Sequence, residues 1–211
     1  MQPALHPIGI MADSHGKNEL LLNAITALKA LGARRLFHLG DVCDSLSPHL
    51  ITEAMNILSK HHVRCVRGNN ESDILHHNRD AHLSDAQKAA LSLLQNLPYT
   101  VDLGSFRFTH SAPFAYPAAT KRPISEFLPL LTRDDQPDFS ILFRGHSHRP
   151  SILELRQGAI EKIPVQPGVD IPLDRSRRYI ITVGAVETAS SVLFLPREYA
   201  VRFVAVPRHR A

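Results

Sequence analysis

The sequence predicts a layered α/β protein, and two observations support this class. The first third of the chain alternates short apolar runs with helical patterns in the order β-α-β-α-β, which is typical of parallel strands covered by helices. Beyond Pro150 the apolar runs follow one another without helices between them, which indicates antiparallel strands. A chain of 211 residues is long enough for one buried core, so we expect a single domain over residues 1–211.

Three apolar runs in the amino-terminal part are predicted strands, at residues 7–12, 35–39 and 63–66. Between the first two, residues 19–31 place leucine and alanine on one helical face before Gly32, which is a common helix stop. A second helix is expected to open at Ser47-Pro48 and to end near Lys60. Because strands that are joined through helices run parallel, these segments predict a parallel unit.

The middle of the chain is less regular and combines loops, a hairpin and short helices. Ser84 starts a capping pattern for a helix that ends before Pro98, and Gly104 marks the turn of a hairpin. The expected segments are a loop at 72–82, a helix at 84–97, hairpin strands at 99–103 and 105–109, a loop beside the site at 111–123, a helix at 124–131 and a buried strand at 139–143.

The carboxyl-terminal part is expected to consist of strands. Gly158 is the expected turn of a hairpin, and Arg197-Glu198 joins the last two strands. The expected strands are residues 151–157, 159–165, 178–184, 190–196 and 199–207. We therefore expect a parallel half, an antiparallel half, and a functional site at the edge that they share.

The composition is that of an ordinary globular protein, with 44% apolar and 21% charged residues. The chain has no signal-peptide pattern and no apolar run of the ~18 residues that span a bilayer, so we expect no membrane partner. Its two cysteines, Cys43 and Cys65, give no disulfide framework and favour a reducing compartment. We expect a cytoplasmic protein.

The formal net charge of +4 is mildly basic. Lysine and arginine cluster near the carboxyl terminus, at residues 175–178 and 207–210. Such a balance could favour anionic substrates or nucleic acid. Clusters of this kind are more often solvated surface, so nucleic acid is the weaker interpretation.

Five polar fragments lie at or near the ends of predicted strands. They are Asp13-Ser14-His15, Gly40-Asp41, Gly68-Asn69-Asn70-Glu71, His110 and Gly145-His146-Ser147-His148. In a layered α/β protein the carboxyl ends of strands converge on one edge of the sheet, where binding sites are built. Ligands that are far apart in the sequence can therefore meet there around metal ions.

The potential ligands in these fragments are two aspartates, one asparagine and four histidines. This set suits divalent Mn, Fe, Co, Ni or Zn, and the lack of a thiolate disfavours a closed structural zinc site. In extended geometry residues i and i+2 point the same way, so Asp13 and His15 could reach one ion. His146 and His148 have the same spacing and could serve one ion or two. The two carboxylate oxygens of Asp41 could bridge two ions.

In this order the fragments resemble the motifs of the calcineurin-like metallophosphoesterase superfamily, in its small bacterial form, over nearly the whole chain. The late glycine-containing strand at 179–186 is also similar. The resemblance implies a four-layer α-β-β-α sandwich with mixed sheets and a site for two divalent ions (Mn, Fe, Ni or Zn) at the edge between the sheets. By this resemblance, the first ion is bound by Asp13, His15 and His148. The second ion is bound by Asn69, His110 and His146, and Asp41 bridges the two ions.

One position departs from the family pattern. The family commonly carries a histidine where this chain has Asn70, and that histidine acts as an acid toward the leaving group or stabilises the transition state. Asn70 can donate a hydrogen bond to a phosphoryl oxygen but cannot deliver a proton at neutral pH. Asp44 would orient the missing histidine in relatives, which leaves its role open here. Alternative acids are His76, His77 and His82, although loop histidines are usually solvated.

We expect a dinuclear metal-dependent phosphoesterase that hydrolyses phosphodiester or pyrophosphate bonds of a small nucleotide or metabolite through a metal-activated hydroxide. Small relatives with other residues at the position of Asn70 are often phosphodiesterases, which favours diesters over monoesters. A nuclease is an alternative that only the basic charge supports. A second alternative is a non-catalytic protein-interaction scaffold. A retromer subunit that resembles this fold has that role, and the retromer subunit also lacks the histidine. The intact set of seven ligands favours catalysis.

Overall fold

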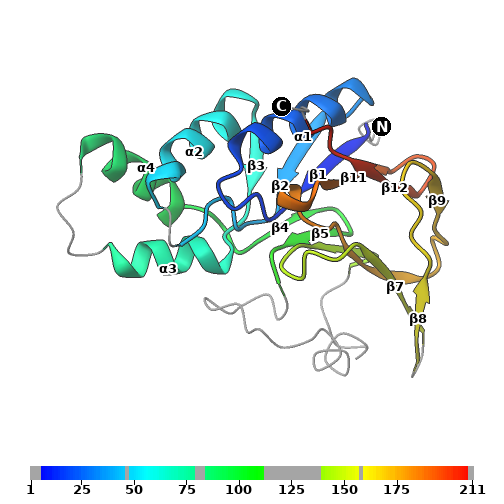
Figure 1. Ribbon diagram of the computed structural model, residues 1–211. Coiled ribbons are helices and arrows are strands. Elements are labelled where there is room, and N and C mark those ends of the chain that lie inside the picture. Colours follow the sequence, from blue (N-terminus) through cyan, green and yellow to red (C-terminus); the bar gives the residue numbers. More distant parts are fainter. Residues whose placement is uncertain (1–5, 46–47, 79–83, 112–138, 157–158, 209–211) are drawn as a thin grey trace.

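The structure is a computed structural model that describes residues 6–45, 48–78, 84–111, 139–156 and 159–208. Two six-stranded sheets pack face to face, and helices cover the outer face of one of them (Figure 1). The predicted class, an α/β sandwich with mixed sheets, is confirmed.

The first sheet contains strands from both ends of the chain. Its strand order is β3-β2-β1-β11-β12-β9. The strands β1, β2 and β3 are parallel, and β11, β12 and β9 join them in antiparallel pairings. The strands are β1 (Ile8–Met11), β2 (Arg35–His38), β3 (Val63–Cys65), β9 (Asp170–Pro172), β11 (Ser190–Leu195) and β12 (Ala200–Ala205).

The second sheet is mixed in the same way, with the order β4-β5-β6-β10-β7-β8. Within it β5, β6 and β10 are parallel, whereas β4, β7 and β8 pair antiparallel to their neighbours. The strands are β4 (Thr100–Leu103), β5 (Phe106–Thr109), β6 (Ile141–Arg144), β7 (Ser151–Arg156), β8 (Ala159–Ile163) and β10 (Arg178–Thr182).

The prediction of separate parallel and antiparallel halves is wrong. The late strand β10 lies between β6 and β7, and the late strand β11 pairs with β1. Each insertion buries an apolar strand at the centre of a sheet rather than leaving it at an edge. Both sheets therefore combine early and late segments of the chain.

The main core lies between the two sheets. Phe37 of β2 stacks on Phe108 of β5 with ring centroids 4.0 Å apart, and Phe194 of β11 meets the edge of Phe106 at 4.8 Å. Aromatic pairs of this kind add stabilisation beyond the area that they bury. This core fixes the two sheets against each other, and with them the loops that leave their strands.

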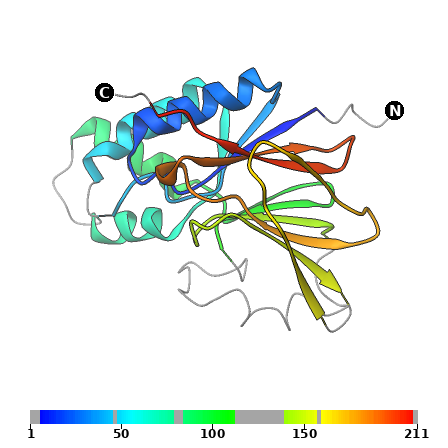
Figure 2. The same ribbon diagram turned by 45° about the vertical axis from the view of Figure 1, so that its right-hand side comes forward.

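Helices pack on the other face of the first sheet and bury Leu21, Ala54 and Leu94 among their apolar contacts (Figures 1 and 2). Ser84 caps the amino terminus of α4 as predicted, because its hydroxyl accepts the backbone N–H of Gln87. The helices are α1 (Asn18–Ala30), α2 (Ile51–Lys60), α3 (Asn69–His77) and α4 (Asp85–Gln95), with short 3₁₀ turns η1 (Pro48–Leu50) and η3 (Val186–Thr188). No helix in the described ranges is long and apolar enough to cross a membrane.

Some local features differ from the predictions. The segment 72–82 was expected to be a loop, but α3 continues to His77, because Glu71 binds the helix start and Ile74 anchors the helix in the core. The strand β9 and the turn η3 were not predicted. The loop at 112–123, the helix at 124–131 and His82 lie outside the described residues.

Candidate metal centre

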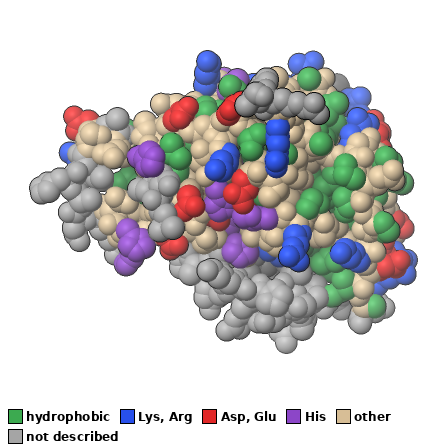
Figure 3. Space-filling view, viewed as in Figure 1, with side chains coloured by type: hydrophobic (Ala, Val, Ile, Leu, Met, Phe, Trp, Pro, Cys, Tyr) green, Lys and Arg blue, Asp and Glu red, His purple; other side chains and the backbone are tan. Residues whose placement is uncertain are grey.

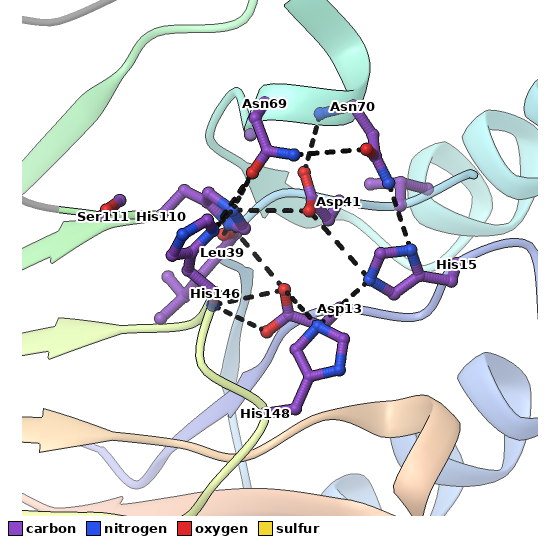
Figure 4. Close-up of polar contacts among 12 residues, drawn as sticks. Asp13, His15, Leu39, Asp41, Asn69, Asn70, His110, Ser111, His146 and His148 are labelled. Carbon is purple, nitrogen blue, oxygen red and sulfur yellow. Dashed lines mark hydrogen bonds and ion pairs between the residues drawn. The ribbon is translucent and has the colours of Figure 1, made fainter. Parts of the chain in front are cut away.

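The seven predicted ligands lie together at one edge of the two sheets (Figure 4). Asp13 and His15 follow β1, Asp41 follows β2, Asn69 follows β3, His110 follows β5, and His146 and His148 follow β6. These strands are parallel within each sheet, so their carboxyl ends open on the same edge. Figure 3 shows histidine and acidic side chains gathered on one exposed face of the molecule.

Asp13, His15 and His148 form one group that could hold a metal ion. Their ligand atoms all lie within 4.8 Å of one another. The Nε2 atoms of His15 and His148 are 3.2 Å apart, and Nε2 of His148 is 3.5 Å from Oδ1 of Asp13. Two ring nitrogens and one carboxylate oxygen therefore face a common point.

Asp41, His110 and His146 form a second such group. Nε2 of His110 lies 3.2 Å from Nδ1 of His146 and 3.5 Å from Oδ2 of Asp41. The carboxamide oxygen of Asn69 joins them, 3.0 Å from Nε2 of His110 and 3.1 Å from Nδ1 of His146. His146 and His148 thus point into different groups, although only one residue separates them.

Asp41 lies between the two groups. Its Oδ1 atom accepts the backbone N–H of Asn70 at 2.9 Å. Its Oδ2 atom is 3.5 Å from Nε2 of His110 in one group and 3.9 Å from Nε2 of His15 in the other. One carboxylate oxygen therefore faces imidazoles of both groups.

Five of the candidate ligands have left-handed backbone conformations, with φ between 45° and 71°, namely Asp13, His15, Asp41, His146 and His148. The expectation that i and i+2 pairs converge because the chain is extended is therefore wrong. The pairs sit in tight loops after the strands. Positive φ is uncommon for residues other than glycine and persists only where the surrounding structure enforces it.

Backbone hydrogen bonds between neighbouring loops enforce these conformations. The amide of Asp13 donates to the carbonyl of Gly40, and the amide of His15 donates to the carbonyl of Asp41, at 3.0 and 3.1 Å. Ser14 adds a side-chain link, because its hydroxyl donates to the carbonyl of Val42 at 2.9 Å. The loops after β1 and β2 thus form one unit that presents both aspartates.

Glycines allow the loops to approach closely. A Cβ atom on Gly68 would lie 2.5 Å from the backbone nitrogen of Asp41, and one on Gly145 would lie 2.7 Å from Oδ2 of Asp13. Gly40 has φ +83°, and its Cβ would lie 2.6 Å from the nitrogen of Gly68. A side chain at any of these positions would displace a candidate ligand.

The tautomer of His110 is fixed by its surroundings. Its Nδ1 atom lies 2.7 Å from the carbonyl oxygen of Leu39. A carbonyl oxygen can only accept, so Nδ1 carries the proton and Nε2 presents its lone pair to Asp41 and His146. This is the tautomer that a metal ligand requires.

Burial controls the ionisation of the centre. Burial raises the pKa of Asp41 to about 7, lowers the pKa of His146 to about 4 and lowers the pKa of His15. Burial alone would raise the pKa of Asp13, but its hydrogen bond with His148 and the charge of His110 lower this pKa overall. Neutral imidazoles are the form that binds a metal, and a cation would stabilise the buried carboxylates.

The orientation of the Asn69 amide shows whether the donor set fits a metal ion. In one orientation, the amide oxygen points toward His110 and His146. The lone pairs of this oxygen, of the two ring nitrogens and of the Asp41 carboxylate then converge, with distances of 3.0 to 3.5 Å between these atoms. With the amide turned over, its NH₂ group would donate to His110, His146 and Asp41 at 3.0 to 3.2 Å. The first orientation places only acceptors around one point, which a cation makes favourable, so the donor set fits a metal ion.

Asn70, which replaces the family histidine, is largely buried between the groups. Its Nδ2 atom lies 3.1 Å from Nδ1 of His15, and its Oδ1 atom accepts from Nδ2 of Asn69 at 3.2 Å. Asp44 is partly buried, and its charge opposes the burial that lowers the pKa of His15. Both residues therefore act on ligands of the centre.

Two of the histidines that were considered as acids lie in the described residues, and both are outside the two groups. His76 and His77 are exposed on the last turn of α3. His77 uses Nδ1 to bond the carbonyl of Asp73 in the same helix at 2.8 Å. Neither belongs to the two metal-binding groups, although both follow closely on Asn70 in the sequence.

Glu187 was not predicted from the sequence, and its carboxylate lies 2.8 Å from Nδ1 of His148. Glu187 is in η3, five residues after the end of β10. Since β10 runs parallel to β6, its carboxyl end opens on the same edge as the candidate ligands. The strand-end rule that located the ligands would have pointed to this segment as well.

Comparison with known proteins shows the family and the fold of the chain. The sequence matches the calcineurin-like phosphoesterase superfamily domain over residues 7–189. Among solved structures, a metallophosphoesterase from Sphaerobacter thermophilus is 22% identical, with a TM-score of 0.70, over 97% of this chain and 89% of that chain. Among curated proteins, none matches the sequence.

Two more distant structures share the fold. A protein of Thermus thermophilus is 10% identical, with a TM-score of 0.51, over 97% of this chain and 100% of its own. A structure described as a novel archaeal phosphodiesterase is 15% identical, with a TM-score of 0.50, over 94% of this chain and 99% of its own. At these identities the likeness concerns the fold alone.

Proposed function

Since this chain belongs to the calcineurin-like phosphoesterase superfamily, we propose that it is a dinuclear metal-dependent phosphoesterase that hydrolyses phosphodiester or pyrophosphate bonds. The observation that carries the proposal is the place of Asp41. Its Oδ2 atom faces His15 in one group and His110 in the other. A carboxylate in that position suits two ions that share one ligand.

The proposed ligands divide as the two groups do. Asp13, His15 and His148 would hold the first ion, Asn69, His110 and His146 the second, and Asp41 both. The donor set favours Mn, Fe, Ni or Zn. When bound, such a pair of ions supplies a hydroxide near neutral pH and positive charge for the phosphoryl oxygens.

The chain's own residues hold and orient the reacting group. We assign Asn70 to bind a phosphoryl oxygen through its NH₂ group, since its amide sits beside ligands of both ions. Asp44 is assigned an electrostatic role on His15. The side chain of Asp41 is held by the amide of Asn70, so the site is built before a substrate arrives.

The chemistry of Asn70 indicates which leaving groups the enzyme would favour. An amide holds no acidic proton, so this position cannot protonate a departing alkoxide. Aryl and phosphate leaving groups need little protonation because their conjugate acids are stronger. This difference favours phosphodiesters with such groups, or pyrophosphates, over alkyl monoesters.

We propose a small phosphorylated metabolite or nucleotide as the substrate, rather than nucleic acid. The candidate ligands lie in short loops after the strands of the two sheets. We propose a cytoplasmic location, because Cys43 and Cys65 are both buried and two cysteines give no disulfide framework.

The first test is metal-dependent hydrolysis. Chelation should abolish hydrolysis of a bis-aryl phosphodiester by the purified protein, and Mn or Ni should restore it. His110→Ala should lose this activity, whereas His61→Ala should keep it, because His61 lies beside Arg34, near the start of β2 and away from the site. Lack of activity with every divalent ion would favour the alternative of a non-catalytic scaffold of the same fold.

A further inference from the structure

The two ring nitrogens of His148 face different neighbours. Its Nδ1 atom lies 2.8 Å from Oε1 of Glu187, and its Nε2 atom faces Asp13 at 3.5 Å and His15 at 3.2 Å. The side chains of His148 and Glu187 are 32% and 27% exposed, so the contact is only partly open to solvent.

The contact determines which nitrogen carries the proton. A carboxylate only accepts hydrogen bonds, so Nδ1 of His148 must donate to Glu187. In the neutral ring, which is the form that binds a metal, the lone pair then lies on Nε2, which points at Asp13 and His15. A carboxylate behind a ligating histidine fixes its tautomer and ring orientation and makes it a stronger ligand.

The backbone around Glu187 holds this carboxylate in place. The amide of Glu187 donates to the carbonyl of Asp13 at 3.2 Å, and the amide of Val186 donates to the carbonyl of Ala12 at 2.8 Å. The turn η3 is therefore bonded to the loop that carries the first ligand of the group (the short orange coil at the centre of Figure 1).

The end of η3 is fixed as well. Ala189 has a left-handed φ of 65°, and the amide of Ser190 donates to the carbonyl of Ala185 at 2.9 Å. The hydroxyl of Ser190 donates to the carbonyl of Val183 at 3.1 Å. Bonds on both sides of Glu187 thus connect it to β10, to β11 and to the loop after β1.

We propose that Glu187 is a positioning residue of the metal centre, which orients His148 through Nδ1 and adds a negative charge behind the group of Asp13, His15 and His148. This inference rests on the proposed function, because it concerns the affinity of one of the two proposed metal sites. It assigns a role to the segment between β10 and β11, which carries no predicted ligand.

The test compares Glu187→Ala and Glu187→Gln with Glu198→Ala. Glu198 is exposed between β11 and β12, at the opposite end of the first sheet, and its removal changes the net charge equally. Binding of Mn²⁺ to each metal-free protein is measured by calorimetry. The tautomer of His148 is measured in the same metal-free proteins from its ¹⁵N ring shifts, at an alkaline pH at which the ring is neutral. Circular dichroism confirms that each variant is folded.

We expect Glu187→Ala to weaken the binding of one Mn²⁺ ion by about 10- to 100-fold, the usual effect of removing such a partner. Glu187→Gln keeps an acceptor oxygen but loses the charge, so its effect should be smaller, and Glu198→Ala should bind as the wild type does. His148 should carry its proton on Nδ1 in the wild type and lose this preference in Glu187→Ala.

Unchanged Mn²⁺ affinity together with an unchanged tautomer in folded Glu187→Ala would overturn the inference. A wild-type protein that binds no Mn²⁺ would instead contradict the proposed function. In that case the tautomer decides the role of Glu187 by itself, because it is measured without metal.

Discussion

The carboxylate of Glu71 accepts the backbone N–H of Asp41 at 2.9 Å, which joins the first turn of α3 to the loop after β2. The same carboxylate accepts the amides of Val42 at 2.8 Å and Gly68 at 2.7 Å. In return, the side chain of Asp41 accepts the amide of Asn70. The acidic residue that ends the Gly68-Asn69-Asn70-Glu71 fragment thus holds the proposed bridging ligand from behind.

Glu71→Gln should destabilise the protein and weaken metal binding. A glutamine can turn only one oxygen toward the three amides, and its NH₂ group would face a donor in a fully buried place. We expect a loss of about 1–3 kcal/mol in the free energy of unfolding, the usual cost of an unsatisfied buried group. Urea denaturation measures it, with Glu19→Gln on the exposed first turn of α1 as the control. Equal stability of the two variants would contradict this role.

Gly68→Ala should remove the metal centre without a change in charge. The added Cβ would lie 2.5 Å from the nitrogen of Asp41 and 2.8 Å from Oε2 of Glu71, so the two loops would have to separate. Calorimetry should show loss of high-affinity Mn²⁺ binding. Gly104→Asn is the control, because a Cβ at Gly104 meets no atom within 4 Å and asparagine tolerates its φ of +61°. Normal Mn²⁺ binding by Gly68→Ala would show that the close approach is not required.

Asn70→His should change the preference for the leaving group. The substitution restores a group that can carry a proton beside His15, whereas the native amide cannot. Hydrolysis of alkyl monoesters should rise more than hydrolysis of aryl diesters, measured as the ratio of the two kcat/KM values. A ratio that stays the same would mean that position 70 does not select the leaving group.

The positions of the seven candidate ligands could be predicted because they depend on a local rule. Each follows an apolar run, and the carboxyl ends of parallel strands meet at one edge. The division of His146 and His148 between two groups did not follow from spacing, because it depends on their left-handed backbone conformations. Only the resemblance to the family separated them.

The arrangement of the sheets could not be predicted from patterns along the chain. The place of β10 between β6 and β7, and the pairing of β11 with β1, depend on contacts between distant segments. Part of helix α3 was not predicted because its segment is polar. Among its side chains, Ile74 is apolar and fully buried, so the sequence shows no apolar helical face. Glu187 follows the predicted strand β10, but its contact with His148 depends on the pairing of β10 with β6, which could not be predicted.

The most direct test of a dinuclear centre that shares Asp41 is a count of bound metal ions. The count is made with and without the carboxylate of Asp41. Purified wild-type protein and Asp41→Asn are loaded with Mn²⁺, passed through a desalting column and analysed for metal per chain by mass spectrometry. Because Oδ2 of Asp41 faces both groups, the wild type should retain two ions, and Asp41→Asn should lose both along with its activity. Two retained ions and normal turnover in Asp41→Asn would contradict the bridging role, and a wild type that holds fewer than two ions would contradict a dinuclear centre.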